Sequence, residues 1–365
     1  MKKMSKTFIN NAITYALVIV AFIVMTILLN AGVLTRSMKG QLVPICVYIV
    51  MAVSLNLVVG ISGELCLGHA GFMSVGAFTG VVAAACLAGG VPNPTLRLIL
   101  AMIVGGLLAA VAGVIIGVPV LRLRGDYLAI VTLAFGEIIR NVINCLYVAL
   151  DGSALRMSFN NPVVQDAART AEGIPFQVLI NGPQGATVST KLATFTMGFA
   201  LIIFSLIVVL NLINSRSGRA IMAIRDNRIA AESVGIGVTK YKMMAFVISA
   251  ALAGMAGALY SLNYSTVTAS KFKFDTSILV LVFVVLGGIG NIRGSVIAAT
   301  ILTILPEVLR AFSDYRMLVY AIVLIVVMLA TNSPMLFNLM DKLRVAWTHM
   351  GRGRAKAQGK EGDAA

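Results

Sequence analysis

The amino-acid sequence predicts an all-α, polytopic membrane protein with about ten transmembrane or partly broken helices. Of its 365 residues, 59% are hydrophobic and only 12% are charged, about half the charged fraction of a typical soluble domain. Apolar runs of about 20 residues, long enough to cross a bilayer, recur along the chain. The basic residues lie mainly between and after these runs, as topology signals do. A soluble enzyme, a disordered chain and a disulfide scaffold are therefore excluded, and the net charge of +15 predicts contact with lipid headgroups and no nucleic-acid partner.

The predicted spans follow from these runs in order along the chain. The first follows a short basic segment and has neither the short apolar core nor the cleavage site of a signal peptide, so we expect it to remain as a helix. The eighth and ninth spans are short, and the third begins in glycine-rich sequence. The spans are predicted at 12–34, 41–60, 68–89, 97–118, 127–149, 194–214, 242–264, 275–288, 295–311 and 316–332.

The distribution of basic residues orients the chain in the membrane. Of the 29 basic residues, 18 fall on the side of the N-terminus and 10 on the other side. Because basic loops stay in the cytoplasm, both termini are predicted to be cytoplasmic. The transmembrane domain 12–332 is thus flanked by a cytoplasmic N-terminus at 1–11 and a basic cytoplasmic tail at 333–365. Within it, 150–193 is predicted to be external, and 215–241 is predicted to be a cytoplasmic loop.

Two glycine-rich segments, 60–71 and 287–294, interrupt the apolar pattern. Non-helical backbone at membrane depth needs a protein or water-filled setting, and transporters place such breaks near the substrate path. We therefore expect a substrate path lined by glycines and one aromatic residue from both segments. Ordinary tight loops between close-packed helices remain the alternative. The predicted path residues are Gly68, Gly71, Phe72, Gly287, Gly288 and Gly290.

The remaining chemistry-bearing residues point away from catalysis. Glu137 and Arg140 share one helix face in the fifth span, and we interpret them as a mutually neutralised structural pair, with a proton relay as the alternative. The four cysteines form no C-x-x-C pair, and no P-loop occurs in the sequence. We expect no catalytic residue, no metal site, no cofactor bound by this chain and no enzymatic activity, so any ATP would be used by separate subunits.

The most informative polar stretch is 217–235, on the predicted cytoplasmic side. It contains two short helix-compatible pieces that are rich in alanine and arginine and are expected to end at glycine. The small residues would let another protein approach closely, and glycine would end each helix with a left-handed turn. Its spacing resembles the E-A-A-x-x-x-G signature of importer permeases, with Ile229 in place of the glutamate. We predict that this segment couples the chain to an ATPase. The predicted coupling residues are Gly218, Arg219, Arg225, Ala230, Ala231 and Gly235.

Several motifs in order resemble the branched-chain amino acid permeases of the LivH/LivM type, with the greatest similarity to the LivM branch. They lie at 67–72, 122–140, 218–225, 241–260 and 285–290. The segment 150–193 departs from the family pattern. The resemblance implies the permease fold of a bacterial inner-membrane ABC importer. It further implies a LivH-like second permease, two LivG/LivF-like ATPase subunits and a periplasmic or lipid-anchored binding protein, with leucine, isoleucine and valine as cargo.

Two other functions remain open from the sequence. A related branch of the family moves urea or short amides. An ion-coupled amino-acid transporter would also explain the broken spans and the Glu137–Arg140 pair, but it would have no use for a segment that docks on an ATPase. Association with ATPase subunits therefore separates the two mechanisms.

Overall fold

The computed structural model describes residues 6–32, 35–123, 125–152, 154–163 and 176–309, together with single positions between 315 and 325. The chain divides into two compact units, 1–307 and 308–365. The account below concerns the first unit, because few residues of the second are described.

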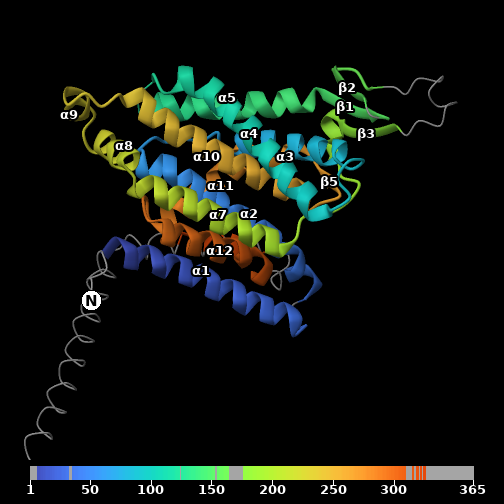
Figure 1. Ribbon diagram of the computed structural model, residues 1–365, viewed down its shortest axis with the longest axis horizontal. Coiled ribbons are helices and arrows are strands. Elements are labelled where there is room, and N and C mark those ends of the chain that lie inside the picture. The colour runs from blue at the N-terminus through green and yellow to red at the C-terminus, as the bar shows by residue number, and fades with distance from the viewer. Residues whose placement is uncertain are drawn as a thin grey trace, which may run out of the picture. The chain divides into compact units, whose positions relative to one another are not determined.

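The described part of the chain is mainly helical, as the apolar runs predict (Figure 1). Nine helices of 14 residues or more lie within the described residues. They are α1 (Lys6–Asn30), α2 (Arg36–Asn56), α3 (His69–Cys86), α4 (Pro94–Val120), α5 (Asp126–Asn144), α7 (Phe195–Asn214), α10 (Val238–Ser261), α11 (Phe274–Gly287) and α12 (Ile292–Val308). Each overlaps one of the first nine predicted spans.

Within the described residues, six helices are long and apolar enough to cross a membrane: α2, α3, α4, α5, α7 and α10. Helix α11 and the apolar part of α1 are shorter. The tenth predicted span, 316–332, and the tail lie largely outside the described residues, so the expected count of about ten membrane helices is not confirmed.

Glycines bring α3, α4 and α10 into near backbone contact at the centre of the unit. A Cβ atom on Gly76 would lie 2.0 Å from the carbonyl oxygen of Gly254, and one on Gly257 would lie 2.0 Å from that of Met73. A Cβ atom on Gly105 would lie 2.9 Å from the oxygen of Gly76. Small residues permit such close crossings, which stabilise helix association in lipid through van der Waals contact.

The chain is not all-α, because the segment between α5 and α7 contributes four strands of a small antiparallel sheet. The strand order is β2-β1-β3-β4-β5. The strands are β1 (Leu146–Asp151), β2 (Ala154–Phe159), β3 (Phe176–Asn181), β4 (Ala186–Thr187) and β5 (Thr266–Val267), with the short 3₁₀ turns η2 (Gly182–Gln184) and η3 (Ala269–Phe272). The fifth span was predicted to continue to 149, but α5 ends at Asn144. A short apolar run such as 146–150 cannot be assigned to helix or strand by periodicity alone.

The sheet and the polar loop lie at opposite ends of the helices. Helix α7 leads from the sheet to α8 (Arg216–Asp226) and α9 (Arg228–Ser233), and α10 returns to β5 (Figure 1). Helix α2 continues into a π-helical turn, η1 (Leu57–Ile61). This turn contacts Arg225, near the last residue of α8. Both glycine-rich segments are therefore at the end of the molecule that carries the polar loop.

Candidate coupling and translocation site

The polar loop folds into two short helices separated by Asn227. The backbone N–H of Asn227 donates to the carbonyl of Ala223 at the end of α8, and its side chain accepts from the N–H of Ala230 at 3.0 Å to begin α9. The first helix therefore ends at asparagine and not at glycine as predicted. The second ends just before Gly235, whose φ of +81° is the left-handed conformation typical of a helix C-terminus.

The surface of this pair of helices combines exposed apolar side chains with small residues. Ile229 and Val234 are 80% and 73% exposed. Of the predicted coupling residues, Ala230, Arg219 and Gly235 are exposed, whereas Ala231 and Gly218 are buried. Ala231 packs in a small core with Ile224 and Val238. Ile229 and Val234 are thus exposed beside small residues, and a role of this surface in coupling stays a prediction.

Arg225 links this surface to the first glycine-rich segment. Its Nη1 donates to the carbonyl oxygen of Gly60 at 2.9 Å, and its Nη2 donates to Asp226 Oδ1 at 2.9 Å. Gly63 has a φ of +74°, and a Cβ atom there would lie 2.7 Å from Arg225 Cγ. The arginine stem therefore lies directly against the broken backbone.

A second contact joins the same segment to α10. Lys242 Nζ forms an ion pair with Glu64, and each side chain is only 12% exposed. Because both side chains are largely shielded from solvent, salt screens this pair less than it would an exposed pair. The stretch 60–64 is thus held on one side by α8 and on the other by the start of α10.

The two glycine-rich segments contact each other through Asn56, a completely buried residue of α2. Its Oδ1 accepts from the N–H of Gly290 at 2.9 Å, and its Nδ2 donates to Ser295 Oγ at 2.9 Å. A Cβ atom on Gly60 would lie 2.3 Å from the nitrogen of Gly290. One side chain therefore joins η1 to the turn between α11 and α12.

That turn is too tight for larger residues. A Cβ atom on Gly287 would lie 2.3 Å from the nitrogen of Ser295. Gly288 and Gly290 have φ values of +89° and +82°, which side chains other than glycine rarely adopt. These three predicted path residues thus form the turn itself.

The other three predicted path residues lie in close packing. A Cβ atom on Gly68 would be 1.9 Å from the carbonyl oxygen of Thr132, and one on Gly71 would be 2.9 Å from the Cα of Gly136. Phe72 is buried, with its ring edge-on to Phe246 at a centroid distance of 5.4 Å. This arrangement resembles the close-packing alternative, and a role in a substrate path stays a prediction.

Side chains from neighbouring helices bind the backbone around this break. The N–H of Leu67 donates to Thr132 Oγ1 at 3.1 Å, and that of Ala70 donates to Ser277 Oγ at 3.0 Å. The buried His69 ring is hydrogen bonded to Ser54 Oγ at 2.8 Å. The backbone around 66–70 is thus held by side chains of neighbouring helices, whereas Gly63 and Leu65 earlier in the same segment are exposed.

Glu137 and Arg140 form an ion pair with an Oε2–Nε distance of 2.7 Å. The other carboxylate oxygen of Glu137 accepts from the N–H of Phe274 at 3.3 Å. Phe274 is the first residue of α11, where a negative charge is favourable. The pair therefore anchors α5 to the beginning of α11, although the side chains of Glu137 and Arg140 remain 32% and 21% exposed.

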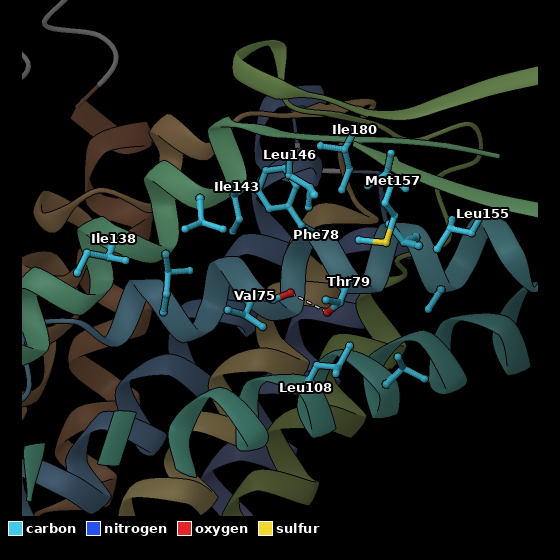
Figure 2. A pocket seen from close by; sticks show the side chains of 16 residues that line it. Val75, Phe78, Thr79, Leu108, Ile138, Ile143, Leu146, Leu155, Met157 and Ile180 are labelled. Carbon is cyan, nitrogen blue, oxygen red and sulfur yellow. Dashed lines mark hydrogen bonds between the residues drawn. The ribbon is translucent and has the colours of Figure 1, made fainter. Parts of the chain in front are cut away.

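An apolar pocket of about 490 Å³ lies between α3, α4, α5 and the sheet, and Figure 2 shows the side chains that line it. Thr79 is its one polar lining residue, and the threonine hydroxyl donates to the carbonyl of Val75 at 2.6 Å. A free amino acid carries an ammonium and a carboxylate group, neither of which would find a partner here. The pocket therefore suits an apolar group and not an amino-acid substrate.

Sequence reasoning missed Asn56 and did not connect Glu64 with Lys242. Asn56 had one signal, since it is an amide residue well inside the apolar run 41–60, whereas Gln41 lies at its edge. The pairing of Glu64 with Lys242 joins residues 178 positions apart, which no local pattern reveals.

Comparison with known proteins identifies relatives along most of the chain. The family model described as "Branched-chain amino acid transport system / permease component" matches residues 37–328. The high-affinity branched-chain amino acid transport system permease protein LivM of Escherichia coli K12 is 35% identical over 295 residues, which cover 78% of this chain and 66% of that protein. The chain thus spans just under two thirds of the length of this relative.

Shorter similarities extend to other permeases. The LivH permease protein of E. coli K12 is 32% identical over 124 residues, covering 33% of this chain and 40% of that protein. The ribose import permease protein RbsC of Haemophilus influenzae is 31% identical over 123 residues, covering 32% and 38%. No solved structure matches the chain.

Proposed function

Because the chain belongs to the family of permease components of branched-chain amino acid transport systems, we propose that it is the membrane-spanning permease subunit of an ATP-driven importer. The proposed cargo is leucine, isoleucine and valine. The chain itself would carry no catalytic residue and would bind no cofactor, and separate ATPase subunits would hydrolyse the ATP.

One observation carries the coupling part of the proposal: Ile229 of α9 and Val234 directly after it are exposed, while Arg225 of α8 donates to the carbonyl of Gly60. An ATPase that binds these exposed side chains would thus lie beside α8, and Arg225 of α8 contacts η1 directly. An ion-coupled transporter has no need of such an exposed apolar surface outside the bilayer.

The proposed assembly contains this chain, a LivH-like second permease, two ATPase subunits of the LivG/LivF type and a binding protein. The orientation from the basic residues puts α8 and α9 in the cytoplasm beside the ATPases. It puts the five-stranded sheet outside, where a periplasmic or lipid-anchored binding protein would dock. The location is the bacterial inner membrane, with both termini cytoplasmic.

The cargo is argued from the similarity to LivM. The shorter similarity to a ribose import permease supports the view that related permeases serve different cargoes, with selection made by the binding protein. Urea or short amides are therefore the second candidate. Competition of labelled leucine uptake by excess urea, acetamide, isoleucine or valine distinguishes the two: only the amino acids should compete if the proposed cargo is correct.

The proposal is tested by reconstituting the complete complex in liposomes and measuring leucine uptake with the binding protein present. We expect uptake with ATP and none with a proton or sodium gradient alone. Uptake driven by an ion gradient without ATP would contradict the importer mechanism and favour the ion-coupled alternative.

The same preparation tests the coupling surface. Ile229→Asp should remove most ATPase subunits from the purified complex, because a charge replaces an 80% exposed apolar side chain at the proposed contact. Phe159→Asp, on β2 and 61% exposed, is the control and should leave ATPase association unchanged. Normal ATPase association of the Ile229→Asp variant would show that α9 is not part of the contact.

A further inference from the structure

Helix α5 is exposed although its sequence is among the least apolar of the six long spans. Of the residues in its apolar stretch, 28% are buried, the smallest share of the six. The similarly polar α3 and α10 are 67% and 61% buried, and the other largely exposed spans, α4 and α7, are much more apolar. In a membrane protein, the exposed helices should be the apolar ones, so α5 departs from the pattern that the other helices follow.

The exposed face of α5 carries polar groups near both ends of the helix and apolar side chains between them. Tyr127 and Asn141 are exposed near the ends, and Ile130 and Ile138 are exposed between them at helical spacing. The partly exposed Glu137–Arg140 pair lies along its edge. By contrast, every exposed residue of α4 after Thr95 is apolar. Polar side chains within membrane spans face protein or water and not hydrocarbon.

Helix α11 lies beside this face and is itself incomplete as a membrane span. Its 14 residues extend only about 21 Å, against about 30 Å for the hydrocarbon core. It is bonded to α5 through Glu137 at its first residue and ends at the glycine turn. A short helix that ends in irregular backbone needs a protein or aqueous neighbour.

We propose that the face formed by α5 and α11 packs against the second permease subunit, while the exposed face of α4 contacts lipid. The proposal rests on the assembly proposed above. Another helical subunit can supply hydrogen-bonding side chains to Asn141, Glu137 and Arg140, which acyl chains cannot.

Site-specific photo-crosslinking in the complete complex tests this surface. The photoreactive residue p-benzoylphenylalanine replaces Ile130 of α5 or, as a matched control, Ile115 of α4. The two side chains are 61% and 67% exposed, and both lie about 6–8 Å along their helices from the end nearer the polar loop. Replacing an exposed side chain also leaves the packed core intact.

Irradiation should join the variant substituted at Ile130 covalently to the second permease, identified by the mass and antibody reactivity of the adduct, with at least fivefold higher yield than the variant substituted at Ile115. An equal or higher yield from Ile115, an adduct with a second copy of this chain, or only lipid adducts from Ile130 would each overturn the assignment while leaving the importer function intact. If the second permease does not co-purify at all, the proposed assembly fails, and this surface fails with it.

Discussion

Asn56 illustrates how a single polar side chain in an apolar span can join two backbone breaks. Its amide oxygen binds the N–H of Gly290 and its amide nitrogen binds Ser295, and it is fully buried. A buried donor that loses its partner costs about 1–3 kcal/mol. The asparagine therefore contributes to the stability of the contact between η1 and the α11–α12 turn.

Replacing Asn56 with leucine should destabilise the protein. The change leaves the N–H of Gly290 and the hydroxyl of Ser295 without this partner, so we expect a loss of about 2–4 kcal/mol. Thermal unfolding in detergent, followed by size-exclusion chromatography, measures the effect. Ser205→Ala is the control, because Ser205 is equally buried but its hydroxyl bonds only within α7. Equal melting temperatures for the two variants would show that the Asn56 bridge is not important for stability.

At this scale, the sequence predicted which residues were unusual but not which ones would meet. The glycine breaks and the loop arginines stand out from the apolar background. Their contacts join Arg225 to Gly60 and Asn56 to Gly290, which are 165 and 234 positions apart. Contacts this distant depend on how whole helices pack, which local composition does not determine.

Among the elements, α8 contacts η1 through Arg225, in addition to its chain connections to α7 and α10. The guanidinium of Arg225 is shared between Gly60 and Asp226, and its stem packs on Gly63. Movement of α8 should therefore displace the backbone at 60–63. A charge-assisted hydrogen bond of this type is worth more than a neutral one.

Arg225→Ala should separate ATP hydrolysis from transport. We expect the reconstituted complex to retain its ATPase subunits and hydrolysis while leucine uptake falls about tenfold or more, corresponding to about 1.4 kcal/mol or more. Arg225→Lys should restore part of the uptake, since an ammonium can still donate to Gly60. Arg216→Ala, at the exposed start of α8, is the control. Unchanged uptake in the Arg225→Ala variant would rule out this connection.

The helices could be predicted from the sequence and the sheet could not. Runs of about 20 apolar residues have one stable outcome in a bilayer, so nine predicted spans coincide with helices. The strands β1 and β3 are six residues each, and β4 and β5 are two residues each. Segments this short carry little periodicity, and β4 pairs with β5 from across α7 and α10.

For the whole molecule, the orientation in the membrane is a prediction from the basic residues. The sheet and the α8–α9 pair lie at opposite ends of α7 and α10, so one labelling experiment fixes both. Ser189 and Ser233 are exposed at these two ends. Ser217, near the start of α8, is half-buried, so Ser233 is the better position for an introduced cysteine at this end.

An impermeant maleimide applied to intact cells should label Ser189→Cys, and it should label Ser233→Cys only after permeabilisation. The exposed Cys86 and Cys145 are replaced by serine beforehand, and the buried Cys46 and Cys66 are kept. Their background labelling is measured in the variant that carries neither new cysteine. The reverse pattern would invert the topology and move α8 and α9 away from any cytoplasmic ATPase.

The pairing of β4 with β5 has a mechanical consequence. These strands precede α7 and follow α10, and their register joins Ala186 to Val267 and Thr187 to Thr266. The two helices are thus tied together at one end, while α8 and α9 connect them at the other. With about 30 Å of helix between the ends, a push of about 2 Å on α8 corresponds to a tilt of only about 4°. We therefore expect the β4–β5 pairing to hold α7 and α10 together at the end that carries the sheet while their other ends, joined to α8 and α9, move.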